Sequence, residues 1–591
     1  MDATNRNTAL ASALVEELAR SGVERAVICP GSRSTPVALA LLREPAITTT
    51  SIVDERSAAF FALGAANATR KPVAVSCTSG TAAANLHPAV CEAGEAGVPL
   101  IALTSDRPPE LRGIGAGQTI DQIGLYGSAV RWFCEVGTHD ADDAGLLHMR
   151  ATACRAVALA AGDPRPGPVH LNLSWRDPLG PEPHEGEVAA RSARALAGRG
   201  GDLALTEVFR PSAALRADQV EAIAADLAET DRGLIVAGRQ PNPALGTALA
   251  ALSAATGYPI LAEPTSQARL GPHDRDSVIW AYDAIARARP SALDPELVLR
   301  FGDLPTSKAL REWIGSLDDC AQLVVDPHGD WNEPTRKAGL VLRAEPAGLA
   351  AALASSMPRP PASDTWRVLW KRAGEAAAGE IAAELSGLDE LTEPGLQAAL
   401  RSAYKDGDLV YTASSMPIRD QEGFLASGPD EVLFLSNRGA NGIDGVVSSG
   451  IGAASASGRP TWLVLGDLAL HHDSNGLAAL RNVEPPVRLV VPNNDGGGIF
   501  EFLPQAEQVE RAEFEAIFGT PLGLDLAKLA ELHGIEHRMV MSAAELADLP
   551  RDRHVLAEVP IDRRANVAVH RALWESAAQA IRIALDSPAD G

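Results

Sequence analysis

Short apolar runs alternate with helix-like stretches along most of the chain. Residues 8–21 repeat apolar positions at helical spacing, and the runs that follow have the length of buried strands. The first third contains four such runs, at 26–29, 72–76, 99–104 and 168–173. Strand-length runs separated by helical lengths indicate a parallel sheet that is buried on both faces.

The same alternation appears twice more. A second set of runs lies at 233–238, 258–262, 297–302 and 322–326, and a third at 409–412, 432–435, 461–466 and 487–493. The stretch 178–211 mixes Pro, Gly, Glu and Arg without a strand pattern, which is typical of an interdomain crossing. We therefore predict an α/β fold of three doubly wound parallel-sheet domains, with boundaries at 1–182, 183–360 and 361–591.

Composition narrows the class of protein. A chain of 591 residues with 46% hydrophobic content needs several cores, and a net charge of -24 repels nucleic acid and anionic membranes. The six cysteines form no CxxC pair, which favours a reducing cytoplasm. The sequence shows neither a signal peptide nor an apolar stretch long enough for a membrane span, so we expect a cytoplasmic protein without an integral membrane segment.

Two polar pairs follow neighbouring strands of the third set. Asp467 comes after Gly466 at the end of one predicted strand, and Asn494 follows Asn493 at the end of the next. Either pair alone would be an ordinary turn. Together they place a carboxylate and a carboxamide at the carboxyl edge of a parallel sheet, where such folds bind ligands.

The ligand chemistry of these groups is that of a hard cation. Mg²⁺ prefers oxygen ligands and takes few from protein when phosphate and water complete its shell. Asp467, Asn494 and the carbonyl of Gly496 would leave room for a diphosphate, and glycines at 496–498 let the backbone approach it closely. In this order and spacing the motif resembles the signature of thiamine-diphosphate enzymes.

Glu55 stands at the start of a helix rich in Ala and Gly. An acidic residue there is favourable for the helix by itself. In a thiamine-diphosphate enzyme the same carboxylate would hydrogen-bond N1′ of the cofactor's aminopyrimidine and act as a proton-relay partner.

Basic residues follow several predicted strands in turn-like sequence. The segment 29–36 is predicted to be a strand end, a glycine turn and a helix start with Thr35 as N-cap, which does not explain Arg33. Any one such residue is commonly a solvated surface group. As a set in an acidic protein they predict a pocket for substrates with several carboxylates, and the set is Arg33, Arg107, Lys308, Arg419 and Arg438.

These motifs resemble one family closely, the 2-succinyl-5-enolpyruvyl-6-hydroxy-3-cyclohexene-1-carboxylate synthases of menaquinone biosynthesis. The resemblance runs over nearly the whole chain and is carried by PGSRSTP (30–36), DER (54–56), TSGTAAAN (78–85), SDRPPEL (105–111), SNRGANGIDG (436–445), GDL (466–468) and NNDGGGIF (493–500). It implies pyrimidine-binding, central and diphosphate-binding domains, with thiamine diphosphate and Mg²⁺ (or Mn²⁺) as cofactors.

The resemblance also implies a reaction and an assembly. The enzymes of this family decarboxylate 2-oxoglutarate and add the succinyl carbanion equivalent to isochorismate in a 1,4-addition. The pyrimidine site and the diphosphate site belong to different domains, normally of different subunits, so a homodimer or dimer of dimers is expected.

Carried over residue by residue, the family pattern assigns roles along this chain. Ala309 and Ala469 depart from residues found in some relatives. Metal binding falls to Asp467, Asn494 and Gly496. The catalytic and substrate set is Glu55, Ser32, Arg33, Arg107, Gln118, Lys308, Arg419 and Arg438. Cofactor contacts fall to Glu55, Ser415, Ile443 (the wedge that enforces a V-shaped cofactor), Gly466, Asp467, Leu468, Asn494, Gly496, Ile499 and Phe500.

Two other functions share part of these features. An acetohydroxyacid-synthase-like or simple decarboxylating enzyme would keep Glu55 and the metal motif but use a pyruvate-sized pocket, against which the arginine set argues. A nucleotide-binding or regulatory protein could keep the fold without catalysis. The glycines of 233–239 lack a GxGxxG spacing, so we predict no flavin or nicotinamide there.

Overall fold

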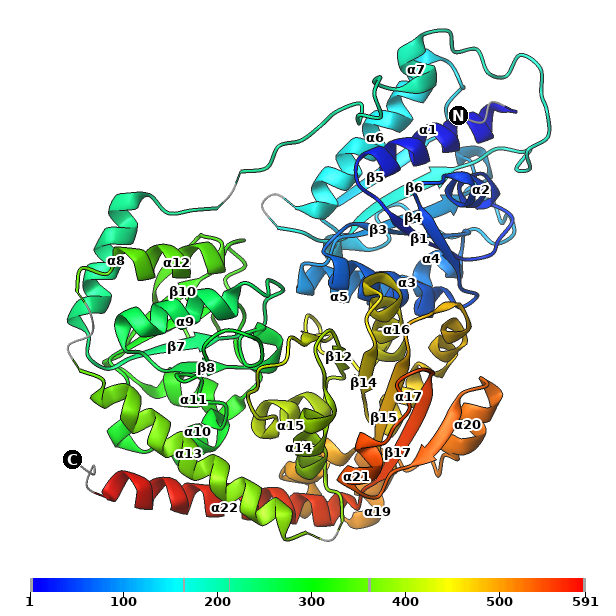
Figure 1. The fold of residues 1–591 in the computed structure, drawn as a ribbon. Coiled ribbons are helices and arrows are strands. Elements are labelled where there is room, and N and C mark those ends of the chain that lie inside the picture. Colours follow the sequence, from blue (N-terminus) through cyan, green and yellow to red (C-terminus); the bar gives the residue numbers. More distant parts are fainter. Residues whose placement is uncertain (1–3, 163–164, 212, 360–362, 389, 588–591) are drawn as a thin grey trace. The chain divides into compact units, whose positions relative to one another are not determined.

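The computed structural model describes residues 4–162, 165–211, 213–359, 363–388 and 390–587, and contains three parallel β-sheets with intervening helices (Figure 1). The predicted fold class is confirmed. The three sheets fall one in each predicted domain, although the predicted boundary between residues 360 and 361 lies outside the described residues. The domain boundaries stay a prediction.

The first sheet has the strand order β2-β1-β3-β4-β6-β5. Its central strands β3, β4 and β6 are buried along their whole length, which accounts for their continuous apolar runs. The strands are β1 (Arg25–Ile28), β2 (Thr48–Ser51), β3 (Val73–Cys77), β4 (Leu100–Asp106), β5 (Trp132–Gly137) and β6 (Val169–Ser174). The helices of this part are α1 (Arg6–Arg20), α2 (Thr35–Arg43), α3 (Glu55–Thr69), α4 (Thr81–Asn85), α5 (His87–Ala96), α6 (Asp143–Ala161) and α7 (Ala193–Ala197).

The second sheet has the order β11-β10-β9-β7-β8. Its strands are β7 (Gly233–Ala237), β8 (Ile260–Ala262), β9 (Leu297–Phe301), β10 (Ala321–Val325) and β11 (Ala338–Leu342). The accompanying helices are α8 (Ala217–Glu229), α9 (Leu245–Thr256), α10 (Tyr282–Ala288), α11 (Lys308–Ser316), α12 (Pro346–Ser356) and α13 (Thr365–Ser386).

The third sheet repeats the topology of the first, with the order β13-β12-β14-β15-β17-β16. Its strands are β12 (Leu409–Thr412), β13 (Leu433–Leu435), β14 (Thr461–Val464), β15 (Val487–Asn493), β16 (Glu536–Met539) and β17 (Val555–Pro560). Its helices are α14 (Glu393–Ala403), α15 (Met416–Phe424), α16 (Val446–Ser457), α17 (Asp467–His472), α18 (Gln505–Gln508), α19 (Arg511–Phe514), α20 (Leu526–Leu532), α21 (Ala543–Ala547) and α22 (Arg563–Asp586).

The shared strand order places the sequence motifs at equivalent points of the two sheets. The loops after β1, β2, β3 and β4 carry PGSRSTP, DER, TSGTAAAN and SDRPPEL. The loops after β12, β13, β14 and β15 carry Ser415, SNRGANGIDG, GDL and NNDGGGIF. Every motif therefore lies at the carboxyl end of a parallel strand, which is the ligand-binding edge of such sheets.

The chain folds into two compact units. The first contains residues 1–210, 437–459 and 469–487, and the second contains 211–436, 460–468 and 488–591. Helix α16 thus belongs to the first unit, although it lies between strands of the third sheet in sequence. It packs along α3 (Figure 1), and the helices approach so closely that a Cβ on Gly452 would overlap the carbonyl oxygen of Phe61.

The predicted crossing at 178–211 is tied to the first unit. Arg150 on α6 donates hydrogen bonds to the carbonyls of Ala195 and Leu196, 3.0 Å each, and pairs with the buried Glu17 at 3.0 Å.

Within the described ranges, no helix combines the length and the apolar character that a membrane span requires.

Candidate active site

Asp467 begins α17 at the end of the third sheet's β14 strand and is buried. Its Oδ2 accepts a hydrogen bond from the backbone N–H of Gly496, 2.9 Å away. Burial raises the pKa of Asp467 to about 6, although backbone N–H groups, that of Gly496 among them, act to lower it. A buried carboxylate of this kind is stabilised when a cation lies beside it.

The side-chain amide of Asn494 is held in one orientation. Its Nδ2 donates to Glu393 at 3.0 Å, while its Oδ1 is buried and accepts no hydrogen bond from the described residues. A buried acceptor without a partner costs free energy unless a ligand meets it. With the Asp467 carboxylate and the Gly496 carbonyl, this oxygen forms a donor set that suits Mg²⁺.

The glycines after Asn494 are required by close packing. Gly496 has φ +141°, and a Cβ there would overlap the carbonyl of Gly519. A Cβ on Gly498 would lie 2.5 Å from Nδ2 of Asn494, and one on Gly497 would overlap the carbonyl of Phe518. The glycine run therefore makes room for the Asn494 amide and for backbone contacts, while its close approach to a diphosphate stays a prediction.

The two apolar residues of the same motif follow directly. Ile499 and Phe500 are half-buried in the short helix Gly498–Phe502, and the Phe500 ring packs on Phe518 with centroids 5.4 Å apart. Leu468 is half-buried beside Asp467, and Gly466 has open space around it.

Ser415 is the N-cap of α15 and has φ +80°, a conformation that non-glycine residues rarely adopt. Arg419, one turn into the same helix, donates from Nη1 to the carbonyl of Ser415. Partial burial and the neighbouring Arg311 lower the pKa of the Arg419 guanidinium. The start of α15 thus has a strained backbone at Ser415, and two cations lie near each other there, Arg419 of α15 and Arg311 of α11.

The first unit brings Arg107 and Gln118 together around Ser79. Arg107 donates to Ser79 Oγ and, at 3.2 Å, to the carbonyl of Gln118, while Gln118 Nε2 donates to the carbonyl of Ser79 at 3.1 Å. Burial and the charge of Arg33 lower the pKa of Arg107. Two guanidinium groups therefore lie near each other at the edge of the first sheet.

Arg33 is held by the end of β6. Its Nη1 donates to the carbonyl of Trp175 at 2.9 Å and lies 3.7 Å from Asp177. The helix after Arg33 begins at Thr35, with Ser34 as N-cap, so the prediction of Thr35 as N-cap was wrong by one residue. The hydroxyl of Thr35 instead donates back to the carbonyl of Ser32, at 2.7 Å, within the turn.

Glu55 is the first residue of α3, as predicted, and is half-buried. The helix is capped by Asp54, whose side chain accepts from the N–H of Ser57 at 3.1 Å. Burial, with Glu55 and Asp54 nearby, raises the pKa of the Cys29 thiol. The carboxyl group of Glu55 is therefore at the same sheet edge as the glycine turn after β1.

The remaining predicted residues divide between the two units. Arg438 and Ile443 are half-buried in the first unit, where the loop that contains them is held by Glu92, which accepts from the N–H groups of Gly439 at 2.7 Å and Ala440 at 2.6 Å. Lys308 begins α11 in the second unit, and its exposed Nζ lies 3.5 Å from Glu312. His471 and His472, at the end of α17, are exposed.

Sequence reasoning did not assign several residues that organise these sites. Ser79 lies inside the TSGTAAAN motif (78–85), just before Gly80, whose φ of +81° marks a special turn. Glu92 and Glu393 carried no sequence signal beyond that of helix residues, because their contacts join segments far apart in the chain.

Comparisons with known proteins agree with these motifs. Residues 8–125 match the family described as thiamine pyrophosphate enzyme, N-terminal TPP binding domain. The 2-succinyl-5-enolpyruvyl-6-hydroxy-3-cyclohexene-1-carboxylate synthase of Chloroflexus aurantiacus is 43% identical, with 96% of each chain covered. That of Geobacillus kaustophilus is 41% identical (98% of this chain, 99% of the other), and that of Myxococcus xanthus 42% (96% and 97%).

The chain belongs to this synthase family. The resemblance noted in the sequence is thereby confirmed, and the protein is an enzyme of the thiamine-diphosphate class. Among solved structures, a Rhodococcus jostii RHA1 thiamine diphosphate-dependent 4-hydroxybenzoylformate decarboxylase has the same fold, with a TM-score of 0.69 and 17% identity over 93% of this chain and 99% of that one. Family membership agrees with the repeated strand order of the first and third sheets.

Proposed function

We propose that the protein decarboxylates 2-oxoglutarate and adds the resulting succinyl group to isochorismate in a 1,4-addition, giving CO₂ and 2-succinyl-5-enolpyruvyl-6-hydroxy-3-cyclohexene-1-carboxylate for menaquinone biosynthesis. The observation that carries the proposal is the position of the family motifs: each lies at the carboxyl end of a strand in one of two sheets with the same order. Near-full-length similarity to synthases of this name supports it.

The second unit would hold the diphosphate end of the cofactor. We assign Asp467, Asn494 and the carbonyl of Gly496 as ligands of Mg²⁺ or Mn²⁺, because the Asn494 Oδ1 is a buried acceptor without a described partner. Ser415, at the start of α15, would face the diphosphate, with Gly466, Leu468, Ile499 and Phe500 lining the rest. Ile443 would support the V-shaped cofactor conformation.

Glu55 would supply the proton relay. Bound thiamine diphosphate supplies an electron sink for decarboxylation of the 2-oxo acid. The Glu55 carboxyl holds a proton against N1′ of the aminopyrimidine, a role that fits its place at the start of a rigid, closely packed helix.

The cationic groups would bind the substrate carboxylates. Arg33 and Arg107 lie near each other in the first unit, with Gln118 and Ser32 in the adjoining turns. Arg438, Arg419 and Lys308 would complete the pocket. Guanidinium groups bind carboxylates through two parallel hydrogen bonds, which fixes the orientation of each substrate as well as its charge.

We propose a cytoplasmic homodimer or dimer of dimers in which each active site uses Glu55 of one subunit and Asp467 of its partner. The six cysteines are free in the structure, which fits a reducing compartment. The three domains would be residues 1–182, 183–360 and 361–591.

The deciding experiment incubates the purified protein with thiamine diphosphate, Mg²⁺ and 2-oxoglutarate, with and without isochorismate, and follows CO₂ and product mass. Isochorismate-dependent CO₂ release with a succinyl adduct would establish the synthase reaction. CO₂ release from pyruvate instead would favour an acetohydroxyacid-synthase-like reaction, and no release from either substrate would contradict the proposal.

A further inference from the structure

Glu393 lies at an unusual place for a carboxyl group. It is the first residue of α14, where an acidic residue ordinarily faces solvent near the helix N-terminus, yet it is only 4% exposed. Burial, and then the neighbouring Asp420, raise the pKa of Glu393 to about 8. Burying a carboxyl group costs free energy unless hydrogen bonds replace its contacts with water. The groups that hydrogen-bond to Glu393 therefore indicate its role.

Both oxygens of Glu393 accept from side-chain amides. Oε1 accepts from Nδ2 of Asn494 at 3.0 Å, and Oε2 accepts from Nδ2 of Asn566 at 2.8 Å. The backbone N–H of Glu393 also donates to Oδ1 of Asn566, at 3.3 Å. The carboxyl group is therefore held on one side by α22 and turned on the other side towards the loop after β15.

This arrangement determines which end of the Asn494 amide faces the site. An amide has one acceptor end and one donor end, and the two look alike in shape. An oxygen of Glu393 satisfies Nδ2, so Oδ1 faces the opposite way, where it has no described partner. If the amide were reversed, Oδ1 of Asn494 would lie 3.0 Å from Oε1 of Glu393, and two acceptor oxygens would face each other without a hydrogen bond.

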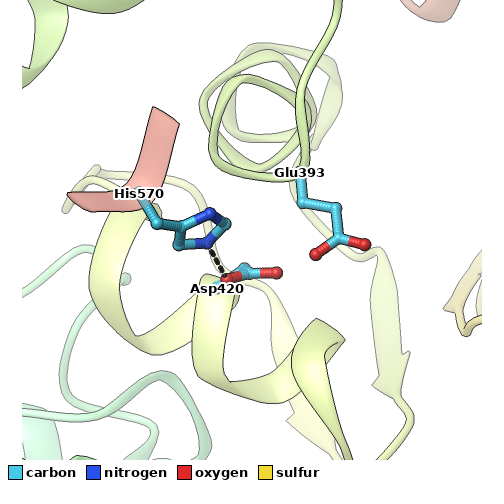
Figure 2. A group of neighbouring side chains, drawn as sticks. All are labelled: Glu393, Asp420 and His570. Carbon is cyan, nitrogen blue, oxygen red and sulfur yellow. Dashed lines mark hydrogen bonds and ion pairs between the residues drawn. The ribbon is translucent and has the colours of Figure 1, made fainter. Parts of the chain in front are cut away.

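The support behind Glu393 extends to α15. His570 on α22 faces Asp420 with Nε2 at 2.8 Å, and its Nδ1 lies 2.8 Å from the carbonyl of Asn566. Figure 2 shows the Asp420 carboxyl between His570 and Glu393. Asp420 follows Arg419 in α15, so the network connects Asn494 to the helix that begins after Ser415.

The same three side chains also form a metal-like donor set. The candidate ligand atoms of Glu393, Asp420 and His570 lie within 4.8 Å of one another. However, both ring nitrogens of His570 and both oxygens of Glu393 already have hydrogen-bond partners. The cluster is therefore a closed hydrogen-bond network, and its open acceptor is Oδ1 of Asn494.

We propose that Glu393 is a positioning residue that holds the amide of Asn494 with its oxygen directed at the bound divalent metal, while Asn566 holds Glu393 in turn. The inference rests on the proposed metal site at Asp467, Asn494 and Gly496. The proposed role of Glu393 is to orient a metal ligand, which is what hydrogen-bond partners of metal ligands commonly do.

The test measures binding of Mn²⁺ by electron paramagnetic resonance in the presence of thiamine diphosphate. In Glu393→Gln one carboxyl oxygen becomes a donor, so either Asn494 or Asn566 loses its acceptor. We expect the Kd for Mn²⁺ to rise ~10–100-fold. The matched control is Glu422→Gln, at another buried carboxyl group, which pairs with Tyr282 and touches no proposed metal ligand, and its Kd is expected to stay at the wild-type value.

The double variant Glu393→Gln with Asn566→Asp separates positioning from general stability. It exchanges the amide and the carboxyl between the two positions, so the introduced glutamine can accept from Asn494 and donate to the introduced aspartate. We expect recovery of Mn²⁺ affinity to within a few-fold of wild type. Recovery of the melting temperature without recovery of Mn²⁺ affinity would mean that Glu393 is only structural and would overturn the inference.

Failure of the inference can be told apart from failure of the metal site itself. If wild-type protein binds Mn²⁺ and Asn494→Ala does not, but Glu393→Gln binds like wild type, the positioning role is wrong. If Asn494→Ala binds like wild type, the proposed metal site is wrong and the inference falls with it. Should Glu393→Gln not fold, Glu393→Asp, which shortens the side chain but keeps the carboxyl group, takes its place with the same expected loss.

Discussion

Gly64 of α3 lies directly against the backbone of Ser449 on α16, with no room for a side chain between them. A Cβ on Gly64 would overlap the carbonyl oxygen of Ser449, and one on Gly452 of α16 would overlap the carbonyl of Phe61 on α3. The Ser449 hydroxyl also donates to the carbonyl of Phe60, at 3.1 Å. This backbone contact joins the helix that begins with Glu55 to the helix that follows Arg438 and Ile443.

Substitution of Gly64 by Ala should destabilise the first unit. The added Cβ meets backbone, which cannot rotate away, so we expect a loss at or above the upper part of the ~1–3 kcal/mol typical of overpacking. Urea denaturation measures it. Gly379→Ala is the control, because Gly379 is within α13 with nothing within 4 Å of an added Cβ, and it should stabilise by ~0.5–1 kcal/mol. Equal effects of the two substitutions would contradict this account of the contact.

Glu55→Gln should nearly abolish turnover while cofactor diphosphate and metal binding remain. The variant keeps the shape of the side chain but removes the proton-relay carboxyl group, whose loss is expected to lower kcat ~10²–10⁴-fold. Steady-state kinetics and Mn²⁺ binding are measured on the same preparation. Glu24→Gln, at an exposed carboxylate paired with Lys71, serves as control. Wild-type turnover in the Glu55 variant would rule out the proton-relay assignment.

Arg107→Gln should raise KM for an anionic substrate, with little change in the melting temperature. A charge-assisted hydrogen bond contributes ~1.5–3 kcal/mol, which corresponds to a KM higher by ~10–150-fold. Arg107→Lys is expected to restore little of this, because an ammonium cannot bind a carboxylate through two parallel bonds. Arg199→Gln, at an exposed pair with Glu207, should leave KM unchanged. If KM rises equally in Arg107→Gln and Arg199→Gln, the cause is the change in net charge and not a specific contact of Arg107.

Asp473→Asn should change how stability depends on pH. Burial raises the pKa of Asp473 to about 6 from an ordinary value of 3.8, despite hydrogen bonds from Ser448 and Ser57. Between these values the folded protein keeps a proton that the unfolded chain has lost, so this group's contribution to stability decreases as pH rises from about 4 to about 6 and is constant above. The upper bound is ~3 kcal/mol.

The measurement compares urea unfolding of wild type and Asp473→Asn at several pH values. The difference in unfolding free energy, wild type minus variant, should fall as pH rises through this window. Asp143→Asn provides a control of opposite sign, because N–H groups of Ser192 and Arg191 lower the pKa of Asp143, whose contribution is lost as pH falls. A pH-independent difference for Asp473 would show that folding does not raise the pKa of its carboxyl group.

The buried strands and the loops after them could be predicted because their signals are local. The apolar runs at 99–104 and 168–173 correspond to β4 and β6, whose residues are buried on both faces. Two edge strands gave no such signal: β2 is Thr-Thr-Thr-Ser and only partly buried, and β16 is Glu-His-Arg-Met. Their pairing to a neighbouring strand, and not their own hydrophobicity, makes them strands.

By itself the sequence determined the alternation of strands and helices, the glycine turns, and the place of each motif at a strand's carboxyl end, since periodicity and turn chemistry act between residues close in the chain. Only the tertiary structure decided that Glu393 turns the amide of Asn494, and that the buried Glu92 holds the loop after Arg438. Such contacts join segments far apart in the chain, and they form because burial leaves polar groups no alternative to one another.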